Sequence, residues 1–458
     1  MVGNSASDAD VIVVGGGTTG AIAAIAAARN GAKTILVDKN GFLGGTATAG
    51  NVFHGFFDCR GNQVVKGIGE ELVQRLVAEE GSPGHLTGGK WGHDVPEYFG
   101  YSQTPYDLET FKYVIMRMVD EANVRMLLHT FVGGALVEGN AVTGIEIQNK
   151  SGRSKLRAKV VVDCSGDADA AAAAGAQYEF GRDDGKAQNV TLLFTLGGVD
   201  FDRVVEYSRA HVRVKTWGEW HSRLMKANKL GEDKPSYVSM SGKIIIDDDL
   251  EKGKELSCGF RSLRPGELRL NVTRTTGIDG TKAEDLTRAE ISERKNAFEV
   301  AKALKKHVPG FEKAYLASTA TEVGVRESRR IVGDYQLSTQ DVAEGRDFSD
   351  SVCRGAYPVD IHDPNGGHVK HTFIKDGLSY GIPYGCFLPK NLEGILVGGR
   401  CISASHEAHG SARQMPTCVG IGQAVGTAAA MAVTKGVTPR GLDVGALRAT
   451  LLAQNACV

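Results

Sequence analysis

The chain has 458 residues, with 53 Lys and Arg against 54 Asp and Glu. This balance leaves no global field to attract nucleic acid or an anionic membrane, and the apolar runs fall short of the ~18 residues that span a bilayer. Eight cysteines without a C-x-x-C pair indicate free thiols in a reducing compartment, which disfavours a redox disulfide or structural zinc. Because the start of the sequence also lacks the layout of a secretory signal, we expect a cytoplasmic protein of two or three domains.

The first forty residues predict a strand, a glycine-rich turn, a helix and a second strand. Residues 10–14 form the first apolar run, the turn GGGTTG runs from Gly15 to Gly20, and the second strand ends at Asp38. In a Gly-x-Gly-x-x-Gly turn, the glycines permit a tight bend, close approach of a pyrophosphate to the backbone, and close packing of helix on strand. Asp38 follows Gly20 at about the spacing of the acid that binds a ribose hydroxyl. Together these features predict a bound dinucleotide.

The middle of the chain is predicted to mix loops, helices and strands. Residues 41–50 are small and predict an extended loop that can lie against a flat ligand. The patterns predict helices at 68–78 and 107–122, strands at 124–128, 141–147 and 159–163, and a loop over 85–106. Beyond about residue 197 the charge rises, and residues 290–306 predict a charged, solvent-facing helix.

The glycine-rich, small-residue composition returns near the end of the chain. Residues 395–399 predict a strand that enters a turn, and a helix capped by Thr417 is predicted to run to Lys435, where Gly436 stops it. Since similar composition lies at both ends, we predict an α/β protein whose Rossmann-like domain is interrupted by an α+β substrate or cap domain. The first domain takes residues 1–60, 110–200 and 385–458, and the second takes residues 61–109 and 201–384.

Three features favour FAD over NAD as the dinucleotide. Residues 160–167 end a strand in a second glycine turn, which also has the simpler interpretation of an ordinary strand–helix junction. Gly398-Gly399-Arg400 forms a third turn, and the N-terminus of the Thr417 helix would point into the same crevice, toward the flavin pyrimidine. No second Gly-x-Gly-x-x-Gly follows a strand, so no NAD(P) domain is predicted. Electrons would then pass to or from the substrate, oxygen or an external carrier.

Several motifs together resemble the FAD-dependent oxidoreductases related to the fumarate reductase and succinate dehydrogenase flavoproteins, and above all a bacterial branch of them. The motifs lie at residues 14–20, 43–48, 163–169, 324–333, 357–362, 398–410 and 411–418. The resemblance implies a flavoprotein of the two-dinucleotide-binding type. Because no histidine lies between Gly41 and Gly50, where relatives attach flavin covalently, it implies noncovalent FAD.

The resemblance also implies which residues contact FAD. The adenine would meet the backbone at Val132, and Arg400 would lie near the flavin. The implied contacts are Gly15, Gly17, Thr18, Thr19, Gly20, Asp38, Lys39, Gly44, Gly45, Thr46, Val132, Gly166, Arg400, Thr417 and Cys418.

A histidine–arginine spacing supplies the main catalytic candidates. In fumarate reductase relatives a His-Gly-x-x-Arg run binds the substrate carboxylate, and His409 and Arg413 have that spacing here. Arg413 is therefore predicted to bind substrate, with a buried structural arginine as the alternative. His409 or the nearby His406 would move the proton, although a structural role is the simpler interpretation of either histidine alone.

Other polar residues are weaker candidates. Arg329, His54 and Tyr384 are predicted to reach the substrate, with ion pairing or packing as their ordinary alternatives. Arg326 could reach the pocket together with Arg329 or Arg330, and the alternative is a helix that forms salt bridges at a domain interface. One dense cluster has the side chains of a metal site, but its turn sequence and the resemblance explain it without metal, so we predict none. It consists of Asp360, His362, Asp363, His368 and His371.

The predicted function is hydride transfer between a small or medium polar organic substrate and flavin N5. The substrate is expected to bear a carboxylate or hydroxyls and to lie under the cap domain. One alternative is a flavin oxidase or monooxygenase that uses oxygen. Another is a flavin-binding subunit that serves a partner protein. A homo-oligomer is compatible with the sequence, and no nucleic-acid or membrane partner is expected.

Overall fold

A parallel sheet forms the centre of the protein. The computed structural model describes residues 7–50, 52–90, 100–204, 207, 239–240, 244–245, 255–256, 259–366 and 369–458. The sheet has the strand order β6-β2-β1-β9-β23. Its strands are β1 (Ala9–Val14), β2 (Thr34–Val37), β6 (Arg125–Leu127), β9 (Gly152–Asp163) and β23 (Ile395–Val397). Most of their apolar residues are buried, as expected of parallel strands covered on both faces. The predicted α/β class is confirmed.

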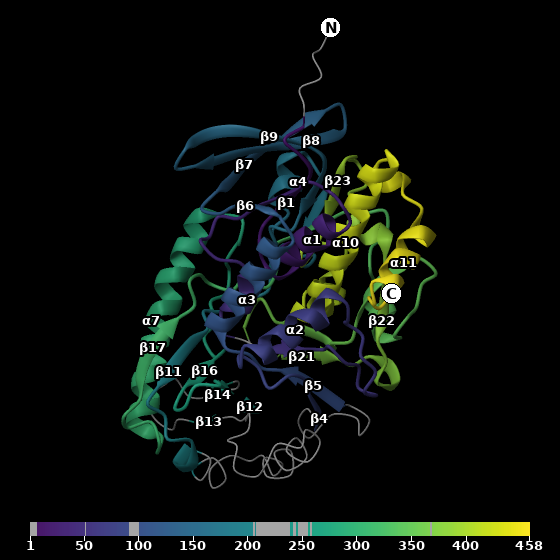
Figure 1. Ribbon diagram of the computed structural model, residues 1–458. Coiled ribbons are helices and arrows are strands. Elements are labelled where there is room, and N and C mark those ends of the chain that lie inside the picture. The colour runs from purple at the N-terminus through teal and green to yellow at the C-terminus, as the bar shows by residue number, and fades with distance from the viewer. Residues whose placement is uncertain are drawn as a thin grey trace.

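These strands come from all three chain segments predicted to share one domain, because β1 and β2 precede residue 60, β6 and β9 lie between 110 and 200, and β23 follows 385. In Figure 1, the N-terminal helix α1 (Thr18–Arg29) lies beside the C-terminal helix α10 (Met415–Lys435). The assignment of residues 1–60, 110–200 and 385–458 to one domain, and of 61–109 and 201–384 to the other, stays a prediction.

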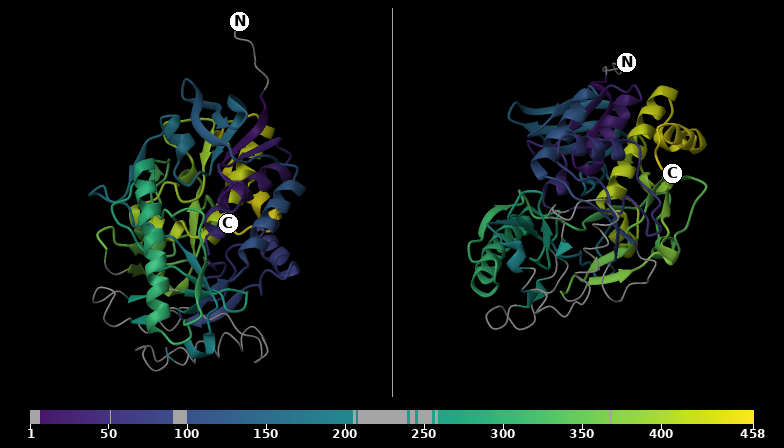
Figure 2. Two further views of the ribbon diagram at one scale, coloured as in Figure 1. Left: turned by 90° about the vertical axis from the view of Figure 1, so that its left-hand side faces the viewer. Right: turned by 60° about the horizontal axis from the view of Figure 1, so that its bottom comes forward.

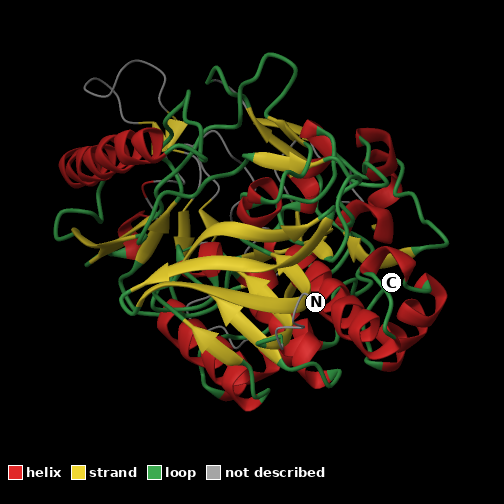
Figure 3. Cartoon of the chain, turned by 90° about the horizontal axis from the view of Figure 1, so that it is seen from above, coloured by secondary structure: helices red, strands yellow, loops and turns green. Residues whose placement is uncertain are grey.

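An antiparallel extension continues from β9. Strand β8 (Ala141–Asn149) pairs with the outer part of β9, and β7 (Phe131–Glu138) pairs with β8. Figure 3 shows these long strands crossing the top of the molecule. Strand β7 was not predicted, because Gly133 and Gly134 interrupt its apolar pattern and most of its residues are at least partly exposed.

Two glycine-containing helices pack tightly against each other beside the sheet. They are α1 (Thr18–Arg29) and α10 (Met415–Lys435). A Cβ on Gly422 would lie 2.5 Å from the Thr19 carbonyl oxygen, and one on Gly426 would lie 2.2 Å from that of Ala23. Only glycine allows this approach of the two backbones.

The ends of α10 test the predicted boundaries. As predicted, the helix stops at Gly436, which has φ 66°. It starts at Met415, with Gln414 in the cap position. The prediction that Thr417 caps the helix was wrong. Pro416 fits the first turn of a helix, so the helix starts two residues before Thr417. Among the described residues, α10 is the helix long and apolar enough to cross a membrane, and 78% of its apolar window is buried inside the protein. Such burial is typical of a core helix.

The remaining helices near the sheet largely follow the predictions. Helices at 68–78 and 107–122 are confirmed as α2 and α3, the latter begun by Asp107, whose carboxylate accepts from the Glu109 and Thr110 amides. The predicted loop over 85–106 was wrong where described, because β5 pairs there with both β4 and β3. The bounds are α2 (Ile68–Ala78), α3 (Leu108–Glu121), α4 (Asp169–Ala173), α11 (Val444–Ala453), β3 (Phe53–His54), β4 (Leu86–Lys90) and β5 (Gly100–Thr104).

A second sheet packs against the long helix α7 (Ala283–His307) on the other side of the molecule (Figure 2). Its strand order is β12-β15-β16-β11-β17. The helix begins seven residues before the predicted position 290, because the acidic first turn at Glu284 and Asp285 suits a helix N-terminus. The strands are β11 (Phe194–Gly197), β12 (Ser239–Met240), β15 (Gly259–Arg261), β16 (Leu268–Leu270) and β17 (Tyr315–Thr319).

Short elements connect the two sheets. β10 pairs with β18, β19 with β22, β20 with β21, and β13 with β14. The strands are β10 (Tyr178–Phe180), β13 (Ile244–Ile245), β14 (Glu255–Leu256), β18 (Arg329–Ile331), β19 (Ser351–Gly355), β20 (Val359–His362), β21 (Val369–Thr372) and β22 (Tyr380–Pro383). The helices are α8 (Thr339–Ala343), α9 (His406–Ala412), η1 (Gly45–Thr48), η2 (Lys375–Gly377), η3 (Tyr384–Phe387) and η4 (Pro439–Gly441).

Candidate active site

The first glycine turn has the geometry of a phosphate-binding turn. Gly15 has φ +88°, and a Cβ on Gly20 would lie 1.7 Å from the Gly15 carbonyl oxygen, so helix α1 lies directly on the end of β1. Gly17 occupies the cap position of α1 without any side-chain hydrogen bond to the helix. The first backbone N–H groups of α1 therefore have no cap, as an anion-binding helix end requires.

The small-residue loop lies against this turn. The Gly44 amide donates to the Gly16 carbonyl at 2.8 Å, and the Thr18 hydroxyl donates to the Gly44 carbonyl at 3.1 Å. A Cβ on Gly45 would lie 3.0 Å from the Gly17 Cα. The two segments predicted to contact FAD, Gly15–Gly20 and the loop with Gly44, Gly45 and Thr46, are thus adjacent.

Asp38 lies at the end of β2, beside the turn. Its Oδ2 accepts from the Gly16 amide and its Oδ1 from the Asn40 amide, each at 2.6 Å. Burial raises the pKa of Asp38 while these two hydrogen bonds oppose that rise. These hydrogen bonds hold the carboxylate beside the first glycine turn, and its contact with a ribose stays a prediction. The side chain of Lys39 instead forms an ion pair with Glu322, and Val132 is half-buried on β7.

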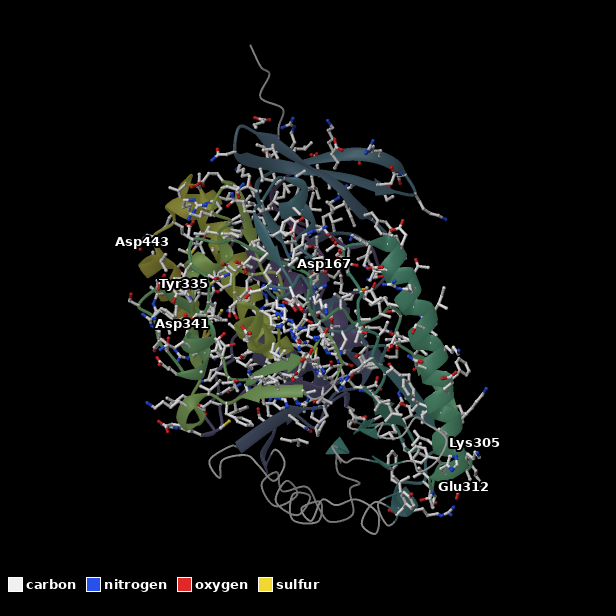
Figure 4. All side chains as sticks on the ribbon, turned by 180° about the vertical axis from the view of Figure 1, so that it is seen from behind. Asp167, Lys305, Glu312, Tyr335, Asp341 and Asp443 are labelled. Atoms are coloured by element: carbon white, nitrogen blue, oxygen red, sulfur yellow. The ribbon has the colours of Figure 1, made fainter. Side chains whose placement is uncertain are left out.

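The second glycine turn contacts Arg400. Gly166 has φ +84°, and a Cβ there would lie 3.2 Å from the Arg400 Nε. The guanidinium donates to Asp167 Oδ1 at 2.5 Å and to the Ser328 hydroxyl at 2.8 Å. Figure 4 labels Asp167 below the antiparallel strands, between the α10 and α7 sides of the molecule. Because Asp167 offsets its charge, Arg400 would act on a nearby flavin more weakly than a free cation.

The start of α10 closes this region. Thr417 and Cys418 are buried, and burial raises the pKa of the Cys418 thiol to about 11, with a hydrogen bond from Thr19 acting in the opposite direction. A Cβ on Gly399 would lie 2.9 Å from the Thr19 hydroxyl. The first turn, the Gly399 turn and the start of α10 therefore meet, although the side chains of Thr417 and Cys418 are directed into the protein.

The two predicted catalytic histidines are buried. His409 has no exposed surface, and neither of its ring nitrogens has a hydrogen-bond partner in the described part of the chain. Burial lowers the pKa of His409 well below its usual value, and Arg330 and Arg413 add to the effect. The Nδ1 of His406 lies 2.8 Å from Glu327 Oε1, and Glu327 also pairs with Arg330. His409 is thus enclosed by the protein and His406 is held by Glu327, and the catalytic role of either histidine stays a prediction.

Replacement of His409 by leucine is expected to make stability less sensitive to acid. Folding keeps His409 neutral while the unfolded chain binds its proton below about pH 6.5. The lowered native pKa means that stability falls as pH falls, by up to about 1.4 kcal/mol per pH unit for one histidine. Urea unfolding of His409→Leu between pH 7 and 5 should show a slope smaller by up to that amount. Exposed His129→Asn is the control, and identical slopes in His409→Leu and the unmodified protein would contradict the assignment.

Arg413 faces a carboxylate flanked by two histidines. Its Nη2 lies 3.2 Å from the Asp360 carbonyl oxygen, 3.6 Å from Asp360 Oδ2 and 3.5 Å from Gln188 Oε1. His362 Nε2 lies 3.5 Å from one Asp360 carboxylate oxygen, and His371 Nδ1 lies 3.7 Å from the other. We call these four residues, Arg413, Asp360, His362 and His371, the Arg413 cluster.

The Arg413 cluster stabilises the ionised form of Asp360. Burial opposes ionisation of Asp360, but the neighbouring imidazoles and the Arg413 guanidinium outweigh it and hold the pKa of Asp360 well below its usual range. Burial lowers the pKa of His362 to about 3, with Arg326 adding to the shift, and burial also lowers the pKa of His371. At neutral pH the cluster therefore contains an aspartate, a guanidinium and two neutral imidazoles.

The remaining predicted substrate residues divide between this cluster and other sites. His54 is buried on β3, where burial lowers its pKa to about 3 and Asp360 opposes that shift, so it lies within the field of the cluster. Arg329 instead pairs with Asp169 at 3.0 Å and contacts the Asp167 carbonyl. The Tyr384 hydroxyl donates to the Pro439 carbonyl at 2.9 Å.

The dense histidine–aspartate cluster of the sequence is only partly described. His368 lies outside the described residues. Among the residues that are described, no group of three or more His, Cys, Asp or Glu side chains has an arrangement that could hold a metal ion. Asp360 and His362 were not predicted to lie in the substrate site, whereas Arg326 was considered for it together with Arg329 or Arg330. The signal was the motif at 357–362, where two ionisable residues alternate on one strand.

Comparisons with known proteins give a family model and several similar sequences. A family model described as FAD dependent oxidoreductase matches residues 10–451. Dihydrolipoyl dehydrogenase of Caenorhabditis elegans is 54% identical over 43 residues, 9% of each chain. Digeranylgeranylglycerophospholipid reductase 1 of Methanococcoides burtonii is 25% identical over 34% of this chain and 37% of its own. These matches thus span about a tenth and about a third of the curated relatives.

Solved structures with a similar fold have low sequence identity to this chain. A geranylgeranyl bacteriochlorophyll reductase-like protein of Thermoplasma acidophilum has a TM-score of 0.48 and 13% identity over 98% of this chain and 84% of its own. The p-nitrophenol 4-monooxygenase PnpA of Pseudomonas putida has a TM-score of 0.42 and 12% identity over 94% of this chain and 81% of its own.

Proposed function

Because the chain belongs to the FAD-dependent oxidoreductase family, we propose that it transfers a hydride between flavin N5 and a small or medium polar organic substrate that bears a carboxylate or hydroxyls. The observation that carries this proposal is the Arg413 cluster, which joins a cation, an anion and two neutral imidazoles next to the first turn of α10.

The residues of the glycine turns fit FAD. The uncapped start of α1, the closely packed Gly20 and the held carboxylate of Asp38 match the needs of a pyrophosphate and a ribose. The Gly44–Gly45 loop and Gly166 would line the ribityl and flavin portions. Bound FAD would supply a hydride acceptor or donor at N5.

The Arg413 cluster would position the substrate and move a proton. Arg413 would bind a substrate carboxylate, because a guanidinium fork suits a planar anion, and Asp360 holds that fork in place. The sequence assigned the proton to His409 or His406, but His409 has no exposed surface and His406 pairs with Glu327. We instead propose His371, whose side chain is 25% exposed beside Asp360, since a neutral imidazole next to a carboxylate can accept a proton and be stabilised as a cation.

Anaerobic mixing tests this function. FAD-loaded protein is mixed with a panel of organic acids, sugars and amines while the flavin absorption band is followed. We expect bleaching by members of the panel that carry a carboxylate or hydroxyls. A panel that leaves the band unchanged, in protein fully loaded with FAD, would contradict the proposed reaction.

A second set of measurements addresses the oxygen-using alternative and the partner-serving subunit. Reduced protein is mixed with air and hydrogen peroxide is measured. Slow reoxidation is expected for a dehydrogenase or reductase, whereas rapid peroxide formation would assign an oxidase or monooxygenase reaction. Constant co-purification with another chain, together with an inert flavin, would assign a role as a subunit.

A further inference from the structure

Arg326 is a buried cation whose polar partners are all neutral. Its guanidinium donates to the Asn189 carbonyl at 2.9 Å, to the Thr191 hydroxyl at 2.5 Å and to Asn271 Oδ1 at 3.3 Å. Arg326 is only 9% exposed, and no carboxylate pairs with it in the described part of the chain. Burial of a charge without a counter-ion is costly, so this position is suited to an anion that arrives with a ligand.

Two other arginines act on the charge of Arg326. Burial lowers the pKa of Arg326 to about 9, and the charges of Arg413 and Arg274 add to that shift. Arg326 therefore remains a cation at pH 7, close to Arg413. The two acids that act on Arg326, Asp360 and Glu293, have other partners. Asp360 belongs to the Arg413 cluster and pairs with Arg413. Glu293 accepts from the Leu192 amide at 3.0 Å and from the Thr275 hydroxyl at 2.6 Å.

Two adjacent residues connect the guanidinium groups. The Asn189 carbonyl accepts from Arg326, while Gln188 Oε1 accepts from Arg413 and from the His362 amide. The Gln188 side chain is 1% exposed, and its Nε2 has no hydrogen-bond partner in the part of the chain that is described. The same holds for His362 Nδ1. Thus two residues with unused hydrogen-bonding atoms, Gln188 and His362, adjoin a pair of arginines that carry one more charge than Asp360 offsets.

We propose that Arg326 and Arg413, with the Gln188 amide, form one binding site for a carboxylate group of the substrate. The proposal rests on the proposed function and deepens it, since it makes the substrate an organic anion held from two sides. Arg326 comes from the segment before β18, and Arg413 comes from the junction of α9 and α10. Two guanidinium groups and an amide supply enough donors for both carboxylate oxygens.

Acetate and its neutral counterpart acetamide test the site. FAD-loaded protein is titrated with each by calorimetry, and acetate is expected to bind saturably while acetamide does not. Arg326→Gln and Arg413→Gln are each expected to weaken acetate binding about tenfold or more, as expected when a charge-assisted contact is lost. The control is Arg288→Gln on α7, where an exposed arginine pairs with Asp285, and it should bind acetate normally. FAD content and thermal unfolding are measured for every variant.

Several results would overturn the site. They are absence of saturable acetate binding, equal binding of acetamide, or unchanged acetate affinity in either folded variant. Should Arg326→Gln fail to fold, Arg413→Gln decides. Acetate binding that FAD abolishes would assign the cations to the flavin instead. A different result would reject the proposed reaction but keep the site. In that case acetate binding needs both arginines, while no substrate in the panel reduces the flavin.

Discussion

Gly20→Ala is expected to remove FAD and to destabilise the protein by about 3 kcal/mol, the upper part of the range for overpacked sites. The added Cβ would lie 1.7 Å from the Gly15 carbonyl oxygen and 2.9 Å from its carbon. Both contacts are with backbone, so no side chain can move aside. Helix α1 would have to separate from β1, and its uncapped N-terminus would leave the position that suits a pyrophosphate. FAD content measures the first effect and urea unfolding the second.

Gly441→Ala is the matched control for this substitution. Gly441 is exposed in η4, and a Cβ there would lie 3.6 Å from the Thr438 hydroxyl, an ordinary contact distance. Its effect on stability should stay within about 0.5 kcal/mol, with FAD retained. A Gly20→Ala protein with the FAD content and stability of the control would disprove the close packing of α1 on β1 as the basis of the cofactor site.

Arg413→Ala is expected to lower kcat/KM about a hundredfold, since truncation of one partner of a buried, hydrogen-bonded charge pair costs several kcal/mol. The substitution removes the group proposed to bind the substrate carboxylate and leaves Asp360 without its nearest guanidinium. Arg413→Lys should recover only part of the activity, because an ammonium keeps the charge but not the planar fork. Anaerobic flavin reduction by a substrate active with the unmodified protein measures the effect, at equal FAD content.

Arg182→Ala is the control for loss of an arginine. Arg182 pairs with Asp184, and both side chains are partly exposed. Such a pair contributes little, so kcat/KM should stay close to that of the unmodified protein. An equal effect of the Arg413 and Arg182 substitutions would reject a role for Arg413 in substrate binding.

The parts of the fold that were predicted correctly depend on local signals. The glycine turn, β1, β2 and the helix end at Gly436 each follow from a few adjacent residues whose backbone needs are specific. Strand β7 was missed because its two glycines weaken the alternation, and β4 and β5 were missed because pairing, not apolar pattern, stabilises them. Tertiary pairing thus overrides weak local preference.

The candidate site shows the same division. The spacing of His409 and Arg413 puts both residues in or at the end of one short helix, α9. It does not give the direction in which either side chain points. In α9 the His409 ring turns into the core. Arg326, Arg413 and Asp360 come from distant segments, and only the folded chain brings two guanidinium groups near one carboxylate.

The visible spectrum of the purified protein, before and after acid precipitation, tests the central claim most directly. That claim is that two glycine turns and the start of α10, from opposite ends of the chain, hold FAD without a covalent bond. The account predicts yellow protein with one FAD per chain, all of it released into the acid supernatant. Folded protein that is colourless and takes up no added FAD, or flavin that stays with the precipitate, would contradict it.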